Sequence, residues 1–422
     1  MSFSNFNSYQ KRILIILTLI NFVNWIDRQV LYPLFLLIKN DFAVSYAQLG
    51  LLVAAFSLVH SFGALGLGRL GDRVSRRKVI TYGLFFWSGA TFLSGMAASF
   101  RSLMGARAMV GVGEAAYGPS ATAIISGSFP TELRARVQGI FDLGMFVGGA
   151  SGIILGGVLA ASLGWRPAFF IVGIPGLALA FAIIRLPETR RERVVGQVPF
   201  QALLRVPAYL VVLVSGGFLT FAGHSYIIWG PEFVHRYKGL GLCEAGVLLG
   251  AILVFAGILG VMTGAALADR LARRYAWGRV LTISIGFLVS SPFILCSLHT
   301  SNRVLMLGAF AMGTFFMTWY HGPVTATIHD LVPPRAHSTA MGVYYFLVNL
   351  IATTAAAWLV GVIADHFGLL AGMHTALVAQ VIGALGFFLV IHLIRQHGLH
   401  HPSLASYRAE DKLEADVCPV PA

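Results

Sequence analysis

The sequence predicts an all-α membrane protein with twelve transmembrane helices in two pseudo-symmetric six-helix bundles. Of its 422 residues, 57% are hydrophobic and only 11% are charged, whereas about a quarter of the residues of soluble domains carry a charge. Twelve apolar stretches are long enough to cross a bilayer. A basic motif around Asp72 returns in reduced form around Asp269, 197 residues later. A repeat at about half the chain length is expected of a protein built from two homologous membrane halves.

Each apolar stretch must be helical, because a single segment in hydrocarbon has to satisfy its own backbone hydrogen bonds. In chain order the predicted spans are 12–38, 46–68, 79–98, 102–127, 137–162, 166–186, 206–231, 243–267, 279–298, 303–330, 339–363 and 370–394.

The spans divide the chain into two bundles with short flanking segments. We expect a cytoplasmic N-terminus at 1–11, an N-terminal bundle at 12–186, a cytoplasmic linker at 187–205, a C-terminal bundle at 206–395 and a disordered cytoplasmic tail at 396–422. The linker is predicted from its prolines and its Arg-Arg-Glu-Arg run, and the tail from its histidines, prolines and charges.

The basic residues predict the orientation of the chain. An even number of spans puts both ends on one side, and placing them in the cytoplasm leaves twenty-two Lys and Arg residues inside and six outside. We therefore expect an integral protein of a plasma membrane, the inner membrane in a bacterium. The net charge of +13 is then explained by the basic cytoplasmic loops and their contact with anionic lipids, and it does not indicate nucleic-acid binding.

The sequence shows no pattern typical of an enzyme or of a bound cofactor. Its three cysteines lie far apart without metal-ligand spacing, and there is no phosphate-binding loop or nucleophile arrangement. We predict that the protein is not an enzyme, that it has no cofactor and no metal, and that an ion or substrate gradient drives its action.

Residues 68–78 read Gly-Arg-Leu-Gly-Asp-Arg-Val-Ser-Arg-Arg-Lys. This run resembles the signature loop Gly-x-Leu-x-Asp-Arg-x-Gly-Arg-Arg-Lys of the major facilitator superfamily, with Ser75 in place of the second glycine. Arg107 with Gly111 resembles the Arg-x-x-x-Gly element of the same family, and four glycines spaced by four residues, at 144–156, put a small-residue face on the fifth span. The resemblance covers essentially the whole chain and implies alternating-access secondary transport.

Within that superfamily, residues 24–31 (Asn-Trp-Ile-Asp-Arg-Gln-Val-Leu), 48–52 and 107–115 look like the spinster-like branch. That similarity implies proton-linked transport of lysophospholipids or sphingoid phosphates. The alternative is a proton-linked carrier of small organic anions, such as aromatic carboxylates, or of drugs, because anion symporters share the Asn-x-x-Asp-Arg pattern. A second alternative is a membrane sensor or scaffold that does not transport.

Charged residues inside the spans are the candidate site. Asp27 and Arg28 lie near the middle of the first span and Glu114 near the middle of the fourth, where each charge costs about 2.5–3.5 kcal/mol. Arg107 precedes Glu114 by seven residues, which puts both on one helix face. Burial favours a protonated carboxyl and a nearby guanidinium favours the carboxylate, so this cluster suits proton coupling. The alternative is permanent ion pairs that only hold the bundle together.

We expect proton coupling by Asp27, Glu114 and, as a second site, His321, although His321 is equally well explained as a hydrogen-bonded interior histidine. Two guanidiniums are enough to hold one phosphate or carboxylate. The predicted substrate-binding residues are Arg28, Arg107, Asn24, Tyr117, Trp319, Tyr320, Tyr344 and Asn349. The aromatic ones have an alternative explanation as interfacial belts.

The family resemblance also implies a latch on the inner side. Asp72 is expected to meet the start of the eleventh helix near residue 338, with Asp269 as a weaker counterpart. The predicted gating residues are Asp72, Arg73, Arg76, Arg77, Arg134, Asp142 and Asp269. The expected partners are an amphipathic or anionic small molecule, protons and membrane lipids, with no nucleic acid, and the expected state is a monomer.

Overall fold

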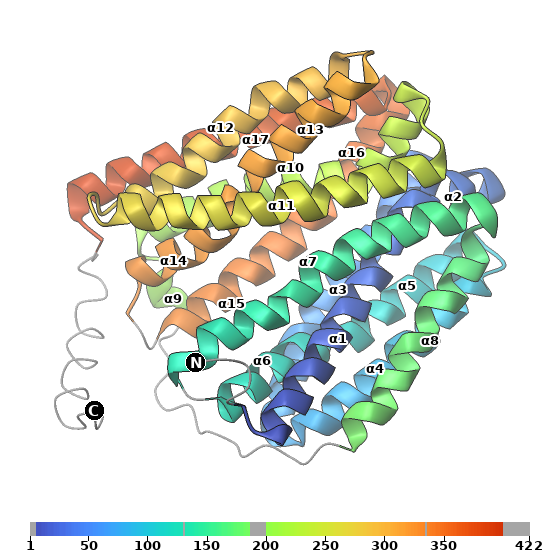
Figure 1. The fold of residues 1–422 in the computed structure, drawn as a ribbon, viewed down its shortest axis with the longest axis horizontal. Helices are drawn as coiled ribbons and strands as arrows, with labels where there is room; N and C mark the ends of the chain where they lie inside the picture. The colour runs from blue at the N-terminus through green and yellow to red at the C-terminus, as the bar shows by residue number, and fades with distance from the viewer. Residues whose placement is uncertain (1–5, 130, 186–199, 334–335, 400–422) are drawn as a thin grey trace. The chain divides into compact units, whose positions relative to one another are not determined.

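A computed structural model describes residues 6–129, 131–185, 200–333 and 336–399 (Figure 1). Within these ranges it describes all side chains except those of residues 65, 68–73, 126, 131–136, 200, 338 and 397. Every regular element in the described part of the chain is a helix, as predicted. The predicted tail beyond residue 399 and most of the predicted linker lie outside the described residues.

The helices follow the predicted spans closely. The first six spans correspond to α1 Ser8–Val30, η2 Tyr32–Leu34, α2 Phe35–Phe42, α3 Tyr46–Arg73, α4 Arg76–Gly95, α5 Phe100–Ala115, α6 Tyr117–Ser128, α7 Thr131–Ser162 and α8 Trp165–Ile184. The short α9 Phe200–Leu203 and the last six spans follow as α10 Pro207–Lys238, α11 Leu242–Ala272, α12 Gly278–His299, α13 Arg303–Met317, η3 Thr318–Tyr320, α14 His321–Leu331, α15 His337–Leu347, the π-helix η5 Val348–Thr353, α16 Thr354–Phe367 and α17 Leu369–His397.

Ten helical segments in the described residues are long and apolar enough to cross a membrane. The other two predicted spans are α4 and the pair α5–α6. They carry more charge, with three basic residues at the start of α4 and with Arg101, Arg107 and Glu114 in α5. The charge of α5 is concentrated at the candidate site.

Several predicted spans contain a break that coincides with a proline. Pro33 lies in η2 between α1 and α2, Pro119 follows the junction of α5 and α6 at Ala116, and Pro323 follows η3 between α13 and α14. Proline has no N–H to donate to the carbonyl four residues earlier, so the helix changes its hydrogen bonding there. The break after α5 lies two residues beyond Glu114.

The connection between α3 and α4 is only two residues long. Ser75 caps α4, because its side chain accepts a hydrogen bond from the backbone N–H of Lys78 at 3.2 Å. The serine that replaces the family's glycine therefore starts the third span, in the manner usual for a helix N-cap.

The chain forms two compact units whose borders fall within helices. The first comprises residues 1–192, 227–254 and 354–372, and the second comprises 193–226, 255–353 and 373–422. A core in the first unit is built by α1 and α4–α8 around Trp87, and one in the second by α10, α12, α14, α15 and α17 around Phe387.

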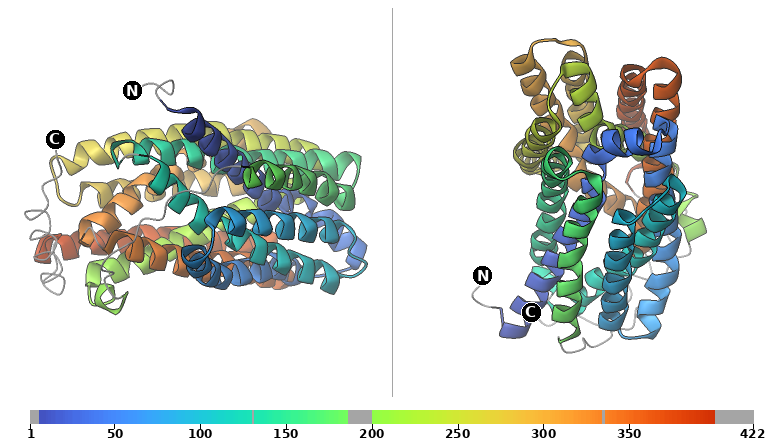
Figure 2. Two further views of the ribbon diagram at one scale, coloured as in Figure 1. Left: turned by 90° about the horizontal axis from the view of Figure 1, so that it is seen from below. Right: turned by 90° about the vertical axis from the view of Figure 1, so that its right-hand side faces the viewer.

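A glycine face on α7 packs against α1 in the first unit. A Cβ atom added at Gly144 would lie 2.6 Å from the carbonyl oxygen of Thr18, and one at Gly152 would lie 2.8 Å from that of Ile26. Gly148 and Gly156 approach α1 equally closely. The two helices run side by side in all three ribbon views (Figures 1 and 2). This close packing fixes the position of α1, which carries two of the candidate charges.

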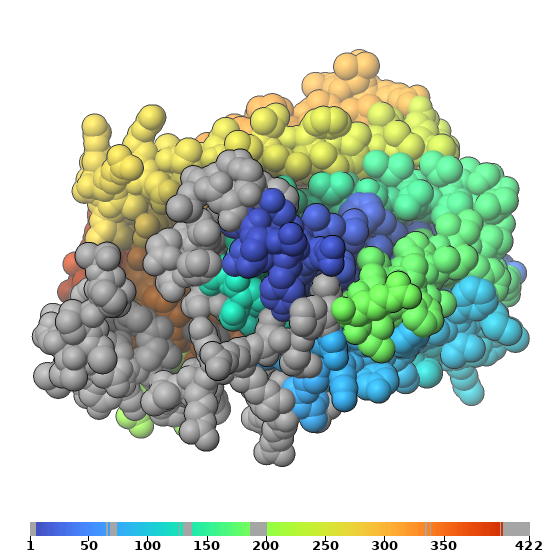
Figure 3. Space-filling view, turned by 60° about the horizontal axis from the view of Figure 1, so that its bottom comes forward, coloured from blue at the N-terminus to red at the C-terminus, as the bar shows by residue number. Residues whose placement is uncertain are grey.

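The first turn of α1 reaches the surface. Ser8 is exposed, and the space-filling view shows the start of α1 beside the end of α8 (Figure 3). Further along, α1 becomes buried, and Asn24 and Asp27 are among its buried residues. The candidate charges of α1 therefore lie in its buried part.

Candidate functional site

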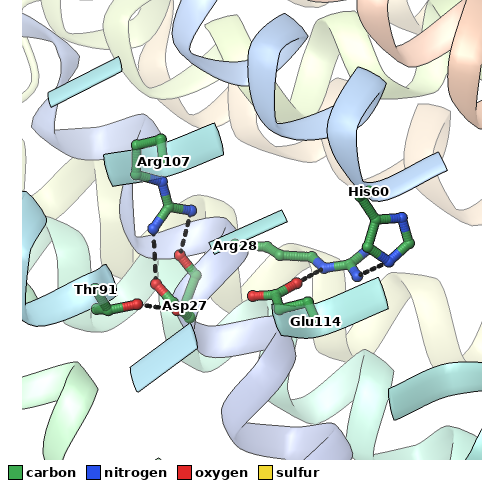
Figure 4. A network of polar contacts seen from close by, with 6 residues as sticks. All are labelled: Asp27, Arg28, His60, Thr91, Arg107 and Glu114. Atoms are coloured by element: carbon green, nitrogen blue, oxygen red, sulfur yellow. Dashed lines mark hydrogen bonds and ion pairs between the residues drawn. The ribbon is translucent and has the colours of Figure 1, made fainter. Parts of the chain in front are cut away.

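Four charged side chains from α1 and α5 form two ion pairs in the first unit (Figure 4). Arg107 donates from Nη1 to Asp27 Oδ1 at 2.9 Å and from Nη2 to the Asp27 carbonyl oxygen at 3.3 Å. Thr91 of α4 donates to Asp27 Oδ2 at 2.5 Å. Both carboxylate oxygens of Asp27 are therefore occupied.

The second pair joins Arg28 to Glu114. Arg28 Nε donates to Glu114 Oε2 at 2.6 Å, and Arg28 Nη2 lies 2.9 Å from His60 Nε2 on α3. The guanidinium also lies over the rings of Trp25 and Phe56, at 5.2 and 5.1 Å from their centroids. Arg28 is thus held from three helices, α1, α3 and α5.

The two arginines differ in exposure. The side chain of Arg28 is 20% exposed, whereas those of Arg107, Asp27 and Glu114 are at most 2% exposed. Two positive and two negative charges balance each other, which buried ions need. Arg28 is therefore the most exposed of the four charged side chains in the network.

Some polar atoms at the network have no hydrogen-bond partner among the described residues. They are Glu114 Oε1, Arg107 Nε and Asn24 Nδ2. Buried polar groups are normally paired. The free oxygen of Glu114 leaves this carboxylate an acceptor for a proton or a substrate group, whereas each carboxylate oxygen of Asp27 already accepts one hydrogen bond.

The structure brings together the four charges that the sequence predicts as a cluster. Arg107 and Glu114 come from one face of α5, as their spacing of seven residues predicts. Neighbours in sequence are not partners, because Asp27 pairs with Arg107 and Arg28 pairs with Glu114. His60 was not predicted as a member of the site. The signal for it was an ionisable residue inside an apolar span.

The remaining predicted substrate-binding residues of α1 and α6 are buried in packing contacts. Asn24 is 3% exposed. Tyr117 donates from its hydroxyl to the carbonyl oxygen of Leu17 at 2.5 Å and packs edge-on against Trp87. These contacts hold α6 against α1 and α4.

The other predicted residues lie in the second unit, whereas the charge network lies in the first. Trp319 and Tyr320 belong to η3, and His321 is exposed at the start of α14. Tyr344 is buried against Gly216, and its hydroxyl has no partner among the described residues. Asn349 lies in the π-helix η5, a distortion that is frequent at functional sites.

The predicted gating residues are only partly described. The side chains of Asp72, Arg73 and Arg134 lie outside the described set, so the latch stays a prediction. Arg76 donates to the carbonyl oxygen of Ala123 at 3.4 Å. Arg77 and Asp142 are partly buried, and Asp142 accepts from Gln138 on its own helix at 3.0 Å.

The predicted counterpart of the latch in the second half is exposed. Asp269 lies 3.8 Å from Arg279, which also pairs with Asp330. Exposed pairs of this kind contribute little to stability.

A polar cluster, which we call the Tyr46 cluster, forms at the other end of α3. It consists of Tyr46, Glu232, Arg236 and Asp365. The Asp365 carboxylate accepts from the backbone N–H groups of Tyr46 and Ala47, both at 2.8 Å, and so caps α3. The Tyr46 hydroxyl donates to Glu232 at 3.1 Å and accepts from Arg236.

The Tyr46 cluster joins α3 of the first six spans to α10 and α16 of the last six, within the first compact unit. Glycines flank it. A Cβ atom added at Gly361 would lie 2.8 Å from the carbonyl carbon of Tyr46, and one at Gly157 of α7 would lie 2.9 Å from the Cα atom of Gly246 on α11. The backbone of α16 therefore approaches that of α3 closely, and so does the backbone of α11 that of α7.

The helical fold and the buried charge pairs define a polytopic membrane transporter. A family model described as Major Facilitator Superfamily matches residues 17–356, and the chain belongs to that superfamily. The predicted fold class, twelve transmembrane helices in the major facilitator fold, is confirmed, and so is the prediction that the chain is not an enzyme.

Its relatives include spinster proteins and an exporter. An MFS-type efflux pump of Mycolicibacterium smegmatis is 28% identical over 83% of this chain and 83% of its own length. Protein spinster of Drosophila melanogaster is 27% identical over 83% of this chain and 61% of its own length. The sphingosine-1-phosphate transporter SPNS2 of Mus musculus is 28% identical over 83% of this chain and 69% of its own length.

A solved structure shows the same fold. A bacterial homolog of the human lysosomal transporter spinster, in an inward-facing and occupied conformation, matches with a TM-score of 0.84 at 24% identity, over 93% of this chain and 99% of that one. The resemblance to spinster-like proteins is confirmed by these relatives.

Proposed function

We propose that this transporter moves a lysophospholipid-like amphiphile, an anion or zwitterion with one long tail, by proton-coupled alternating access. The observation that carries the proposal is the pair formed by Arg28 and Glu114. Arg28 is partly exposed, and its partner Glu114 is buried with one free carboxylate oxygen.

The coupling follows from electrostatics. An anionic headgroup that draws Arg28 toward itself removes the cation that keeps Glu114 ionised. Burial then favours the protonated acid. Substrate and proton therefore bind together. The names of the relatives, which include sphingosine-1-phosphate transporters, support an amphiphilic substrate.

The proposed topology places both termini in the cytoplasm of a bacterial inner membrane, with the chain acting as a monomer. It is supported by the excess of Lys and Arg in the loops assigned to that side. The Tyr46 cluster then lies at the outer end, where it holds the outer side closed.

A second candidate is proton-linked export of drugs or small organic anions. The relative from Mycolicibacterium smegmatis, named as an efflux pump, favours it. The same charge network serves either substrate, so the two candidates differ in what binds beside Arg28.

Substitution of Glu114 by Gln keeps the size of the side chain and removes its titration, so Glu114→Gln isolates the proposed proton step. In proteoliposomes with an imposed pH gradient, accumulation of lysophosphatidylethanolamine should collapse to the level seen without a gradient. Exchange of substrate for substrate should survive, because alternating access does not need the proton step.

Glu244→Gln is the control, because Glu244 lies in the first turn of α11, outside the network. Accumulation by Glu114→Gln at the wild-type level would show that Glu114 is structural and leave Asp27 or His321 as the proton carrier. Gradient-driven movement of a drug or an aromatic carboxylate, and not of the lipid, would favour the second candidate.

A further inference from the structure

The contact between Arg28 and His60 fixes the protonation state of the histidine. Their nitrogens, Nη2 and Nε2, are 2.9 Å apart. Arginine has donors only, so His60 Nε2 must be the acceptor and the ring must be neutral, with its proton on Nδ1. A protonated His60 has no lone pair to offer and would bring a second cation against Arg28.

Arg28 therefore has two acceptors in this state, a carboxylate and a neutral imidazole. An anionic headgroup that accepts from Arg28 replaces one of them. His60 is the weaker acceptor, because a hydrogen bond to a charged group is stronger than one to a neutral group. The headgroup is expected to displace His60 first.

We propose that Arg28 and His60 form the headgroup-binding pair, and that His60 takes up one proton as the headgroup enters between them. Beside an anion, imidazolium becomes a second donor and its charge is favoured. This inference rests on the proposed function and deepens it, because it names a proton site separate from Glu114.

The surroundings of His60 contain few other charges. Arg28 is the charged group in contact with His60, and Arg28 in turn pairs with Glu114, while Phe56 stacks on the His60 ring with centroids 5.6 Å apart. Asp27 and Arg107 form their own ion pair on the other side of the network (Figure 4). The charged residues of the other helices packed on α3 lie toward the ends of those helices, at positions 39 and 41 of α2, 76–78 of α4 and 365–366 of α16. The state of His60 is therefore set by the network in Figure 4.

The test measures proton uptake on binding to the purified full-length chain. The probe is lysophosphatidylglycerol, whose phosphodiester keeps one negative charge across the pH range used. Calorimetric titrations at pH 7 in two buffers of different ionisation enthalpy count the protons. They are made on Glu114→Gln, so that Glu114 contributes none.

We expect Glu114→Gln to take up about one proton per bound lipid, so that its affinity falls about tenfold for each pH unit above neutrality. Glu114→Gln with His60→Gln should take up none and lose this pH dependence. Glu114→Gln with His392→Gln should behave like Glu114→Gln, because His392 is exposed on α17.

Proton uptake that survives His60→Gln overturns the inference. So does the absence of uptake by Glu114→Gln alone, a result that does not depend on folding of the histidine variant. Failure of the proposed function looks different, because wild type and Glu114→Gln would then accumulate lipid equally in a pH gradient.

Discussion

At the scale of single residues, the two buried arginines have different surroundings and should have different roles. Arg107 is 1% exposed and reaches both the carboxylate and the carbonyl oxygen of Asp27. Arg28 is partly exposed and shares its donors between an acid and a histidine. The geometry of Arg107 fits a structural pair, and that of Arg28 fits a group that exchanges partners.

Lysine substitutions separate these roles, because lysine keeps the charge and loses the fork of donors. Arg107→Lys should lower the free energy of unfolding by about 1.5–3 kcal/mol, as a lost hydrogen bond to a charged group does. Arg28→Lys should unfold close to the wild-type temperature. Its affinity for lysophosphatidylglycerol should fall at least about tenfold, which is a loss of about 1.4 kcal/mol of binding free energy.

Thermal unfolding in detergent and binding titrations measure the two effects. Equal loss of stability in both variants would contradict the distinction. Weaker lipid binding by Arg107→Lys at full stability would return Arg107 to the substrate site.

At the scale of helices, the approach of α7 to α1 decides where Asp27 and Arg28 lie. Gly152 faces the carbonyl oxygen of Ile26, the residue before Asp27. A side chain at Gly152 would push this turn of α1 away from α7. The positions of Asp27 and Arg28 therefore depend on the absence of a side chain at Gly152.

Gly152→Ala should destabilise the protein by about 1–3 kcal/mol, as overpacking does, and should also weaken lipid binding through displacement of α1. Gly139→Ala on the same helix is the control, because a Cβ atom there meets nothing within 4 Å. It should be neutral or stabilise α7 by up to about 1 kcal/mol. Thermal unfolding distinguishes them, and a Gly152→Ala variant as stable as Gly139→Ala would contradict the packing described here.

The sequence predicted the spans well because each helix must be apolar over the thickness of a bilayer. It did not predict the π-helix at 348–353, since no glycine or proline marks it. The charged members of the site were predicted because charges stand out in apolar spans. Their pairing was not, because residues 27 and 28 point about 100° apart on the helix and each finds its partner on α5.

At the scale of the whole molecule, the Tyr46 cluster holds the first six spans to the last six at one end of α3. Asp365 accepts two backbone hydrogen bonds at the N-terminus of α3, where a negative charge is also favoured by the helix dipole. In the proposed cycle these contacts must break each time the outer side opens.

Asp365→Asn should shift the population toward the state in which this end is open. The asparagine amide keeps only one acceptor oxygen and carries no charge. Loss of a hydrogen bond to a charged group costs about 1.5–3 kcal/mol, so the closed state should be destabilised enough to change the ratio of the two states about tenfold or more. Accessibility of a cysteine placed at Ala357 to an impermeant maleimide reports the shift. Ala357 is fully buried where α16 meets Gly50.

The control is Asp41→Asn, because Asp41 pairs with Arg166 in an exposed contact that stays within the first six spans. Cys243 is exposed and serves as the reference for the outer face. It should label from outside in every variant if the proposed orientation holds. Equal labelling at position 357 in both aspartate variants would contradict the prediction that Asp365 helps to hold the outer side closed.

The contact between Gly157 and Gly246 bears on the speed of transport rather than on its direction. At this point neither helix has a side chain to rearrange, and the nearest side chain in the contact is Ile154 of α7, which packs against Gly250 of α11. In the proposed cycle, separation at Gly157 and Gly246 should therefore need no side chain of these two residues to move. We therefore expect the polar groups around Tyr46 to set the relative populations of the two states, and the glycine contact to add little to the barrier between them.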